Sequence, residues 1–417
     1  MLSFHRRAFL TSASFVVLAM PSGARAEGPL GVDGYLQIVL RSHPGARQVT
    51  AFEAAASAER KAARQIADPT VAFSWDRATL PASPNPGSTE TGFSVSQTIP
   101  WPGTFTATVR AGDRAADVLR AEGAGARWEL ELEARSAFAR VLYARAALDI
   151  ATAAEADALS LRDLTAKRAE LGEAREVDRI KAEVEWLRQQ RTRRSLDREA
   201  EAAEAILRTL AVEPLPRPLA LTGELPLSMP PVDAAELQER LTRSNPRLAA
   251  ARAAAERDAA LLSVSRRARI PDLDVTWFRN HELDKDANGF SVGVRVPLWN
   301  ANRGEIARAS AATSLASATA QRLFLDLTTA LERARQELDV ASTQSRMLDR
   351  DILPAATRSL ELARFSYREG ETSLLDLLDA QRTFRETQRE TAASRLALAL
   401  ALAEVQRLVG PDFNPSR

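Results

Sequence analysis

The 417-residue sequence contains no cysteine, so it forms no disulfide and offers no thiol for an N-terminal lipid anchor. It has no surplus of one charge either: 56 basic residues meet 55 acidic ones, which argues against nucleic acid as a partner. Beyond residue 26 no run reaches the roughly 18 uncharged apolar residues that a transmembrane helix needs. If the mature protein sits in a membrane, closed β-strands are the remaining way to satisfy its backbone amides.

Histidine is also scarce. His5, His43 and His281 lie far apart in the sequence, and without cysteine no metal-ligand cluster is expected. No nucleophile motif and no glycine-rich phosphate loop after a strand are present, so we predict neither a cofactor nor an enzyme. Aromatic residues make up only 6% of the chain, and alanine-rich charged stretches dominate, as is typical of long helices.

The first 26 residues have the pattern of an export signal. Arg6 and Arg7 give a basic start, an apolar run extends to Met20, and residues 24–26 (Ala-Arg-Ala) supply small residues for cleavage. The arginine pair before Phe-Leu fits a twin-arginine signal as well as an ordinary secretory (Sec) signal, so both routes stay open. We therefore exclude residues 1–26 from the fold.

The remaining chain contains two copies of one unit. Residues 42–44 (Ser-His-Pro) recur as residues 244–246 (Ser-Asn-Pro), 202 positions later, and each opens an alanine-rich helix that ends before a proline, Pro69 or Pro271. Each copy continues with two runs in which apolar and polar residues alternate, a period of two that predicts β-strands. The expected strands cover residues 70–77, 92–100, 272–280 and 289–297.

A long helical hairpin follows each strand pair. Stretches of about 65 residues, at 104–170 and 302–368, contain few glycines, and at 1.5 Å per residue each spans roughly 100 Å. Pro354 predicts a kink in the second stretch. Return helices are expected at 174–211 and 373–409.

The fold class is therefore mostly α with a small β part, built from two tandem helix-strand-strand-helix-helix repeats. The repeats cover residues 27–213 and 232–410, a proline-rich connector at 214–231 separates them, and a tail follows at 411–417.

One chain supplies four strands, whereas transmembrane barrels need at least about eight to close. Two chains would supply eight strands and three would supply twelve, so membrane insertion requires oligomerisation. Trp75, Trp101, Trp277 and Trp299 lie at the ends of the expected strands, where interfacial aromatic girdles occur. The alternative is a small soluble sheet packed on helices.

Three segments carry a resemblance to a known family: residues 97–103 (QTIPWPG), 367–370 (YREG) and 374–381 (LLDLLDAQ). Together with the doubled element order, they resemble the TolC-type outer-membrane factors over essentially the whole mature chain. The resemblance implies a homotrimer in outer-membrane lipid, whose twelve-stranded barrel continues as an α-helical barrel across the periplasm. It also implies docking to a periplasmic adaptor and an inner-membrane pump. The Pro-Trp-Pro-Gly signature resembles the branch that serves heavy-metal cation pumps, the CzcC-like branch.

The expected function is the outer-membrane channel of a tripartite efflux system, a passive duct for small molecules or metal cations. The alternatives are a soluble periplasmic coiled-coil scaffold or adaptor and an enzyme built on helical repeats.

The candidate gate lies just past the second hairpin turn. Asp376 and Asp379 are three residues apart and share a helix face, and the resemblance places them in a ring at the periplasmic entrance. Ser373 and Asp376 also read as a capping box, which leaves the role of Asp376 open. Tyr367 matches a family tyrosine that holds the entrance closed, although Thr372 replaces its arginine partner.

The first repeat matches this pattern only in part. Asp178 corresponds to Asp376, but Lys181 stands where the second repeat has Asp379, and Ala169 stands where it has Tyr367. The resemblance therefore implies that only one hairpin of each chain gates in this way.

Overall fold

The computed structural model describes residues 29–77, 89–229, 233–282, 285–296, 299–411 and 413. The expected export signal and most of the C-terminal tail lie outside these residues. The described chain is mostly helical with one small antiparallel sheet, so the predicted fold class is confirmed. Among the described helices, none has an apolar stretch long enough to cross a bilayer.

The same element order occurs twice. The first repeat consists of α1 (Val32–Ser42), α2 (Pro44–Ala62), β1 (Thr70–Arg77), β2 (Thr89–Ile99), α3 (Pro102–Glu170) and α4 (Glu176–Ala211). The second repeat consists of α5 (Ala234–Ser244), α6 (Pro246–Arg267), β3 (Leu273–His281), β4 (Asp286–Val294), α7 (Arg303–Met347), the π-helical turn η1 (Leu348–Ile352), α8 (Leu353–Glu369) and α9 (Leu374–Val409).

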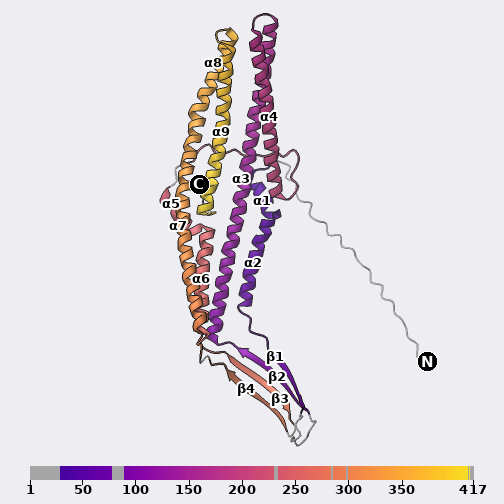
Figure 1. Cartoon of the computed structure of the whole chain (residues 1–417), viewed down its shortest axis with the longest axis vertical. Helices are drawn as coiled ribbons and strands as arrows, with labels where there is room; N and C mark the ends of the chain where they lie inside the picture. The colour runs from indigo at the N-terminus through magenta and orange to yellow at the C-terminus, as the bar shows by residue number, and fades with distance from the viewer. Residues whose placement is uncertain are drawn as a thin grey trace, which may run out of the picture.

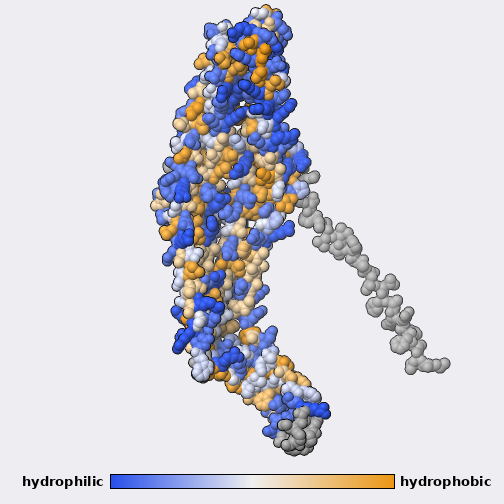
Figure 2. All heavy atoms as spheres, in the orientation of Figure 1, coloured by the Kyte–Doolittle hydropathy of each residue, from blue (hydrophilic) through white to orange (hydrophobic). Residues whose placement is uncertain are grey.

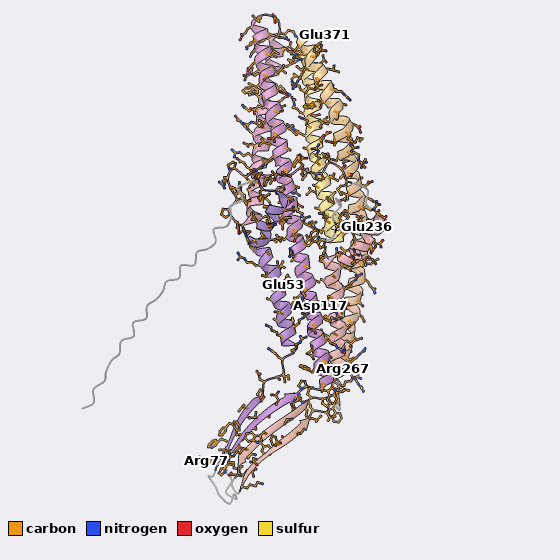
Figure 3. The ribbon with its side chains drawn as sticks, turned by 180° about the vertical axis from the view of Figure 1, so that it is seen from behind. Glu53, Arg77, Asp117, Glu236, Arg267 and Glu371 are labelled. Carbon is orange, nitrogen blue, oxygen red and sulfur yellow. The ribbon has the colours of Figure 1, made fainter. Side chains whose placement is uncertain are left out.

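The molecule is elongated, with the sheet at one end and the two hairpin turns at the other (Figure 1). Glu371, in the turn between α8 and α9, and Arg77, at the far end of the sheet, mark these two ends in Figure 3. α3 alone has 69 residues, which at 1.5 Å per residue gives a rod of about 100 Å. Because the helices are so long, most of the molecule consists of two packed hairpins, α3/α4 and α7–α8/α9.

Equivalent caps start the equivalent helices of the two repeats. His43 Nδ1 accepts a hydrogen bond from the Gly45 N–H at 3.0 Å, and Asn245 Oδ1 accepts one from the Leu248 N–H at 2.9 Å. A proline follows each capping residue, and its fixed φ suits the first helical position. The sequence repeat thus corresponds to a repeated local structure.

The interruption expected at Pro354 takes the form of the π-helical turn η1, directly before α8. Proline has no N–H to donate to the carbonyl four residues earlier, and its ring crowds that carbonyl. A single π-helical turn accommodates this defect without ending the helix.

The sheet has the order β1-β2-β3-β4 with antiparallel neighbours, so the β2–β3 pairing joins the two repeats. β1 covers the expected residues, β2 begins three residues and ends one residue earlier than expected, and β3 lies one residue later than expected. β4 begins and ends three residues earlier than expected, because its ladder with β3 runs from His281↔Asp286 to Leu273↔Val294. Arg295 and Val296 have no partner on β3 in this register.

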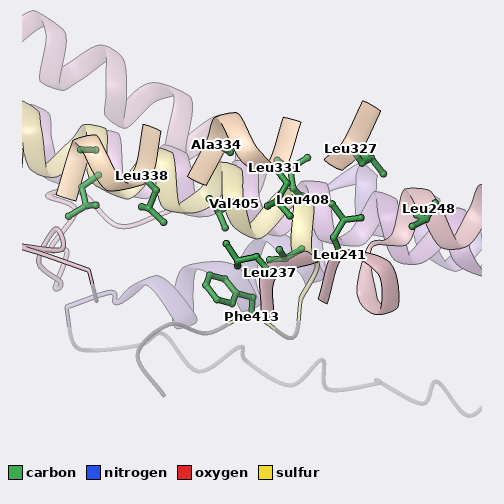
Figure 4. Packing of buried hydrophobic residues seen from close by; sticks show 13 residues of the cluster. Leu237, Leu241, Leu248, Leu327, Leu331, Ala334, Leu338, Val405, Leu408 and Phe413 are labelled. Carbon is green, nitrogen blue, oxygen red and sulfur yellow. The ribbon is translucent and has the colours of Figure 1, made fainter. Parts of the chain in front are cut away.

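Three apolar clusters hold the helices together. One, around Tyr35, Phe138 and Leu207, packs α1 against the first hairpin. A second packs α5 against α7 and α9 and contains Leu237, Leu241, Leu331, Leu338, Val405, Leu408 and Phe413 (Figure 4). The third lies near the hairpin turns and joins Leu161 of α3 to α8 and α9.

Candidate functional site

The two faces of the sheet differ sharply in chemistry. The register places all of the following on one face: Val71, Phe73, Trp75, Phe93, Val95, Ile99, Leu273, Val275, Trp277, Phe290, Val292 and Val294. Several of these side chains are largely exposed in the single chain, Phe290 at 76% and Phe73 at 69%. Figure 2 shows apolar residues along one side of the sheet, next to polar ones. Such a contiguous apolar surface marks a face that contacts lipid or protein.

The opposite face of the sheet is polar. Ser96 and Thr276 form a hydrogen bond of 2.8 Å across β2 and β3, and the Thr98 hydroxyl donates to Asp274 at 2.6 Å. Ser74, Ser94 and Ser291 share this face. One apolar and one polar face is the pattern of strands that separate lipid from a wet lumen.

The four candidate girdle tryptophans occupy three kinds of position. Trp75 lies on the apolar face of β1, and Trp101 and Trp299 lie in the connections between the sheet and the long helices. Trp277 is not at a strand end, contrary to our expectation. It lies in the middle of β3, where it pairs with Val95 and Phe290 and meets the Phe93 ring edge-on at 6.1 Å.

At the other end of the molecule, Asp376 forms the capping box. The Ser373 hydroxyl and backbone N–H both donate to the Asp376 carboxylate, at 2.7 and 3.1 Å, and the Asp376 N–H donates to the Ser373 hydroxyl at 3.3 Å. The side-chain hydrogen bond, and then the backbone one, lower the pKa of Asp376. Its carboxylate is therefore ionised and oriented by the helix start.

Asp379 lies one turn further into α9 and its side chain is exposed. Asp379 therefore lies on the same face of α9 as Asp376 but takes no part in the helix cap. In the first repeat, the Arg175 guanidinium donates two hydrogen bonds to the Asp178 carboxylate, from Nε at 2.9 Å and from Nη2 at 3.2 Å. The Asp178 side chain is only 15% exposed. Lys181 is exposed.

Tyr367 is buried in the third apolar cluster, beside Leu161 and Leu377. The guanidinium of Arg168, from the first hairpin, lies 5.4 Å from the centre of its ring. The Thr372 hydroxyl is buried and has no hydrogen-bond partner. Tyr367 therefore contacts the opposite hairpin through its ring.

Two ion pairs that the sequence pattern did not reveal also join the hairpins near their turns. Arg364 of α8 pairs with Asp157 of α3, and Arg385 of α9 pairs with Glu185 of α4 at 2.6 Å. The Arg385 and Glu185 side chains are only 11% and 15% exposed. The sequence shows many charges on each long helix, but it does not show the helix rotation that selects these pairs.

Metal ligands do not converge in the part of the chain that the structure describes, where no group of three or more His, Cys, Asp or Glu residues is placed to hold an ion. The geometry thus shows an elongated helical body, a sheet with one apolar and one polar face, and a charged tip.

Comparison with known proteins agrees with this geometry. Residues 237–411 match the family described as outer membrane efflux protein. The cobalt-zinc-cadmium resistance protein CzcC of Cupriavidus metallidurans is 27% identical over 283 residues, which are 67% of this chain and 68% of that protein.

Solved structures share the fold. The outer-membrane channel OprN aligns with a TM-score of 0.74 at 20% identity, covering 91% of this chain and 89% of that one. The outer membrane protein VceC of Vibrio cholerae aligns with a TM-score of 0.74 at 17% identity, covering 91% and 96%.

Together with the fold, the family match and the similarity to CzcC support a passive outer-membrane efflux channel that extends into the periplasm rather than an enzyme. The outer membrane efflux protein model matches most of the second repeat, and the predicted resemblance to the TolC-type factors is confirmed. Homologous channels are components of tripartite efflux systems, which implies an adaptor and an inner-membrane pump as partners. These matches favour the channel over the soluble scaffold.

Proposed function

We propose that three copies of this chain form a duct that conducts divalent metal cations from the periplasm across the outer membrane. The apolar sheet face carries this proposal, because its side chains lie exposed in the single chain and need a cover of lipid. β1 and β4 are the two open edges of the sheet. Pairing of β4 with β1 of the next chain would close twelve strands from three chains, which leaves no unpaired amide in lipid.

The tryptophans fit this arrangement in part. Trp101 and Trp299 lie where the sheet meets the helices, the level of the periplasmic membrane surface in the proposed barrel, and Trp75 lies toward the outer surface. Trp277, in the middle of β3, would contact the hydrocarbon core together with Phe93 and Phe290. We assign it no interfacial role.

The charged tip is the proposed entrance. Asp379 from three chains would form a ring of three carboxylates, which attracts cations and repels anions. Asp376 adds a second ring, but its carboxylate also accepts the hydrogen bonds of the helix cap. The Asp379 carboxylate takes no part in the cap and is therefore the one we expect to attract cations at the entrance. Tyr367 would keep the second hairpin against the first, and Asp178 would fix the end of the first hairpin through Arg175.

The proposed cargo rests on the similarity to the cobalt-zinc-cadmium resistance protein and on the Pro-Trp-Pro-Gly signature at residues 100–103. Carboxylates at the entrance suit cations, and the absence of a metal-ligand cluster among the described residues suits a duct that passes ions without holding them. We further propose that the export signal ends at residue 26 and that residues 214–231 connect the two repeats.

Two measurements test this function. Native mass spectrometry of the detergent-extracted protein should give the mass of three chains, and planar bilayers should show cation-selective channels. Cells that lack the gene should become sensitive to zinc, cobalt or cadmium and regain resistance with it. A monomer without channel activity would refute the duct, whereas a trimeric channel whose loss sensitises cells only to organic compounds would refute the metal cargo.

A further inference from the structure

The polar face of the sheet carries a single aromatic side chain among the strand residues that the structure describes. This is Phe278, which alternates with Thr276 and Asn280 along β3 and is therefore on the face opposite Trp277. Its partners in the register are Ser94 on β2 and Gly289 on β4. A bulky ring is thus flanked by a small residue on each side.

The ring extends over Gly289. A Cβ atom added to Gly289 would lie 3.0 Å from Cζ of Phe278, 3.3 Å from Cε1 and 3.7 Å from Cε2. The outer end of the ring therefore occupies the space that a side chain at position 289 would need. The glycine lets the ring lie against the strand, an arrangement known as aromatic rescue of a glycine in a sheet.

Gly293 is a contrasting glycine on the same strand and the same face. A Cβ atom there would lie 3.8 Å from Cβ of Asp274, an ordinary contact distance. A side chain at position 293 is therefore accommodated without displacing a neighbour, whereas one at position 289 moves the Phe278 ring. On the β2 side, Ser94 stands directly opposite Phe278 in the register.

We propose that Gly289 sets the width of the duct at this level by holding the Phe278 ring against the wall. This inference rests on the proposed trimeric barrel, in which the polar face lines the lumen. By symmetry each effect at this pair occurs three times around the pore. A side chain at position 289 would lift three rings into the lumen and narrow it for large solutes, while small ions would still pass.

The absence of cysteine from the chain makes a direct test possible. Ser291→Cys places a single thiol on the polar face of β4, closer to the helices than the Gly289–Phe278 pair. Thiol reagents added outside intact cells must pass the ring to reach it. A small charged reagent and a maleimide on a long polyethylene glycol chain then report access at two sizes.

Gly289→Thr and Gly293→Thr form a matched pair, since each adds the same side chain two residues from the thiol on the same face. We expect Gly289→Thr to slow the bulky reagent several-fold and the small one little, while Gly293→Thr leaves both rates near the parent value. Adding Phe278→Ala to Gly289→Thr should restore the reaction rate of the bulky maleimide reagent.

Equal slowing in both threonine variants, or no recovery with Phe278→Ala, would overturn the inference while leaving the barrel intact. A Ser291→Cys thiol that the small reagent cannot reach from outside, in a protein that is nevertheless in the outer membrane, would instead refute the lumen assignment and with it the proposed function.

Discussion

Removing Glu185 should loosen the contact between the two hairpins more than any other single charge change near the tip. Glu185 accepts from Arg385 at 2.6 Å and from the Gln189 amide at 2.7 Å, and the ion pair is largely shielded from water. Burial is the larger influence on Arg385 and lowers its pKa, and the charge of Glu185 opposes that shift. Glu185→Gln removes the hydrogen-bonded counter-charge of this buried guanidinium.

The expected magnitude follows from the burial. Deleting one partner of a buried ion pair costs roughly 3–5 kcal/mol, and the residual exposure of this pair favours the lower end, about 3 kcal/mol. At tenfold per 1.4 kcal/mol, this corresponds to an increase of about 100-fold in local opening. Native-state hydrogen exchange of the purified protein measures that opening, because amides of α9 near Arg385 exchange through it.

Arg382→Met serves as the matched control on the same helix. Arg382 pairs with Glu386 at 2.8 Å, but these side chains are 72% and 56% exposed. Such an exposed pair contributes less than about 1 kcal/mol, so exchange should rise less than about fivefold. Similar exchange in Glu185→Gln and the parent, or equal increases in both variants, would refute the reasoning. Adding Arg385→Met to Glu185→Gln should recover part of the protection, because it removes the unpaired charge.

Three further outcomes are expected. Tyr35→Phe should lower the free energy of unfolding by about 1 kcal/mol, because it removes the buried 2.9 Å hydrogen bond to the Leu207 carbonyl; an unchanged denaturation midpoint would contradict this. Asp379→Asn should weaken block by multivalent cations in single-channel recordings, and unchanged block after adding Asp376→Asn would refute the carboxylate entrance. Ser373→Ala should lower thermal stability at neutral pH and reduce its loss in acid. The folded-state pKa of Asp376 is depressed, so its stabilisation is present above the unfolded pKa and disappears as the pH falls through the folded pKa; parallel pH profiles would contradict this.

Local patterns predicted the fold well. Alternation located the strands, prolines and glycines bounded the helices, and the repeat revealed that every element occurs twice. The capping box at Ser373 could also be predicted, because its two residues are three positions apart in the sequence. Properties that depend on how helices and strands are placed relative to one another could not be predicted from the sequence. The shifted span of β4 and the central position of Trp277 follow from strand register, and the Glu185–Arg385 pair follows from helix rotation.

The candidate gate was predicted as a list of side chains, but their partners were not. The ring of Tyr367 packs in an apolar cluster under Arg168, a contact that the sequence pattern did not reveal. Arg168 lies about 200 residues away in the sequence, and the chain offers many arginines at similar heights on the first hairpin. Only the packing of α3 against α8 and α9 identifies which of them reaches the ring.

The ion pairs between the hairpins also show how the two repeats have diverged. With the spacing that relates Asp178 to Asp376, the position equivalent to Glu185 is Thr383 and the position equivalent to Arg385 is Leu187, so neither charge occurs in both copies. Two identical hairpins that carried both charges would form the same pair at every contact between hairpins. In the proposed trimer every hairpin has one neighbour from its own chain and one from the next. Since Glu185 and Arg385 join the hairpins within a chain, divergence of the repeats makes these two contacts chemically different without any change of fold.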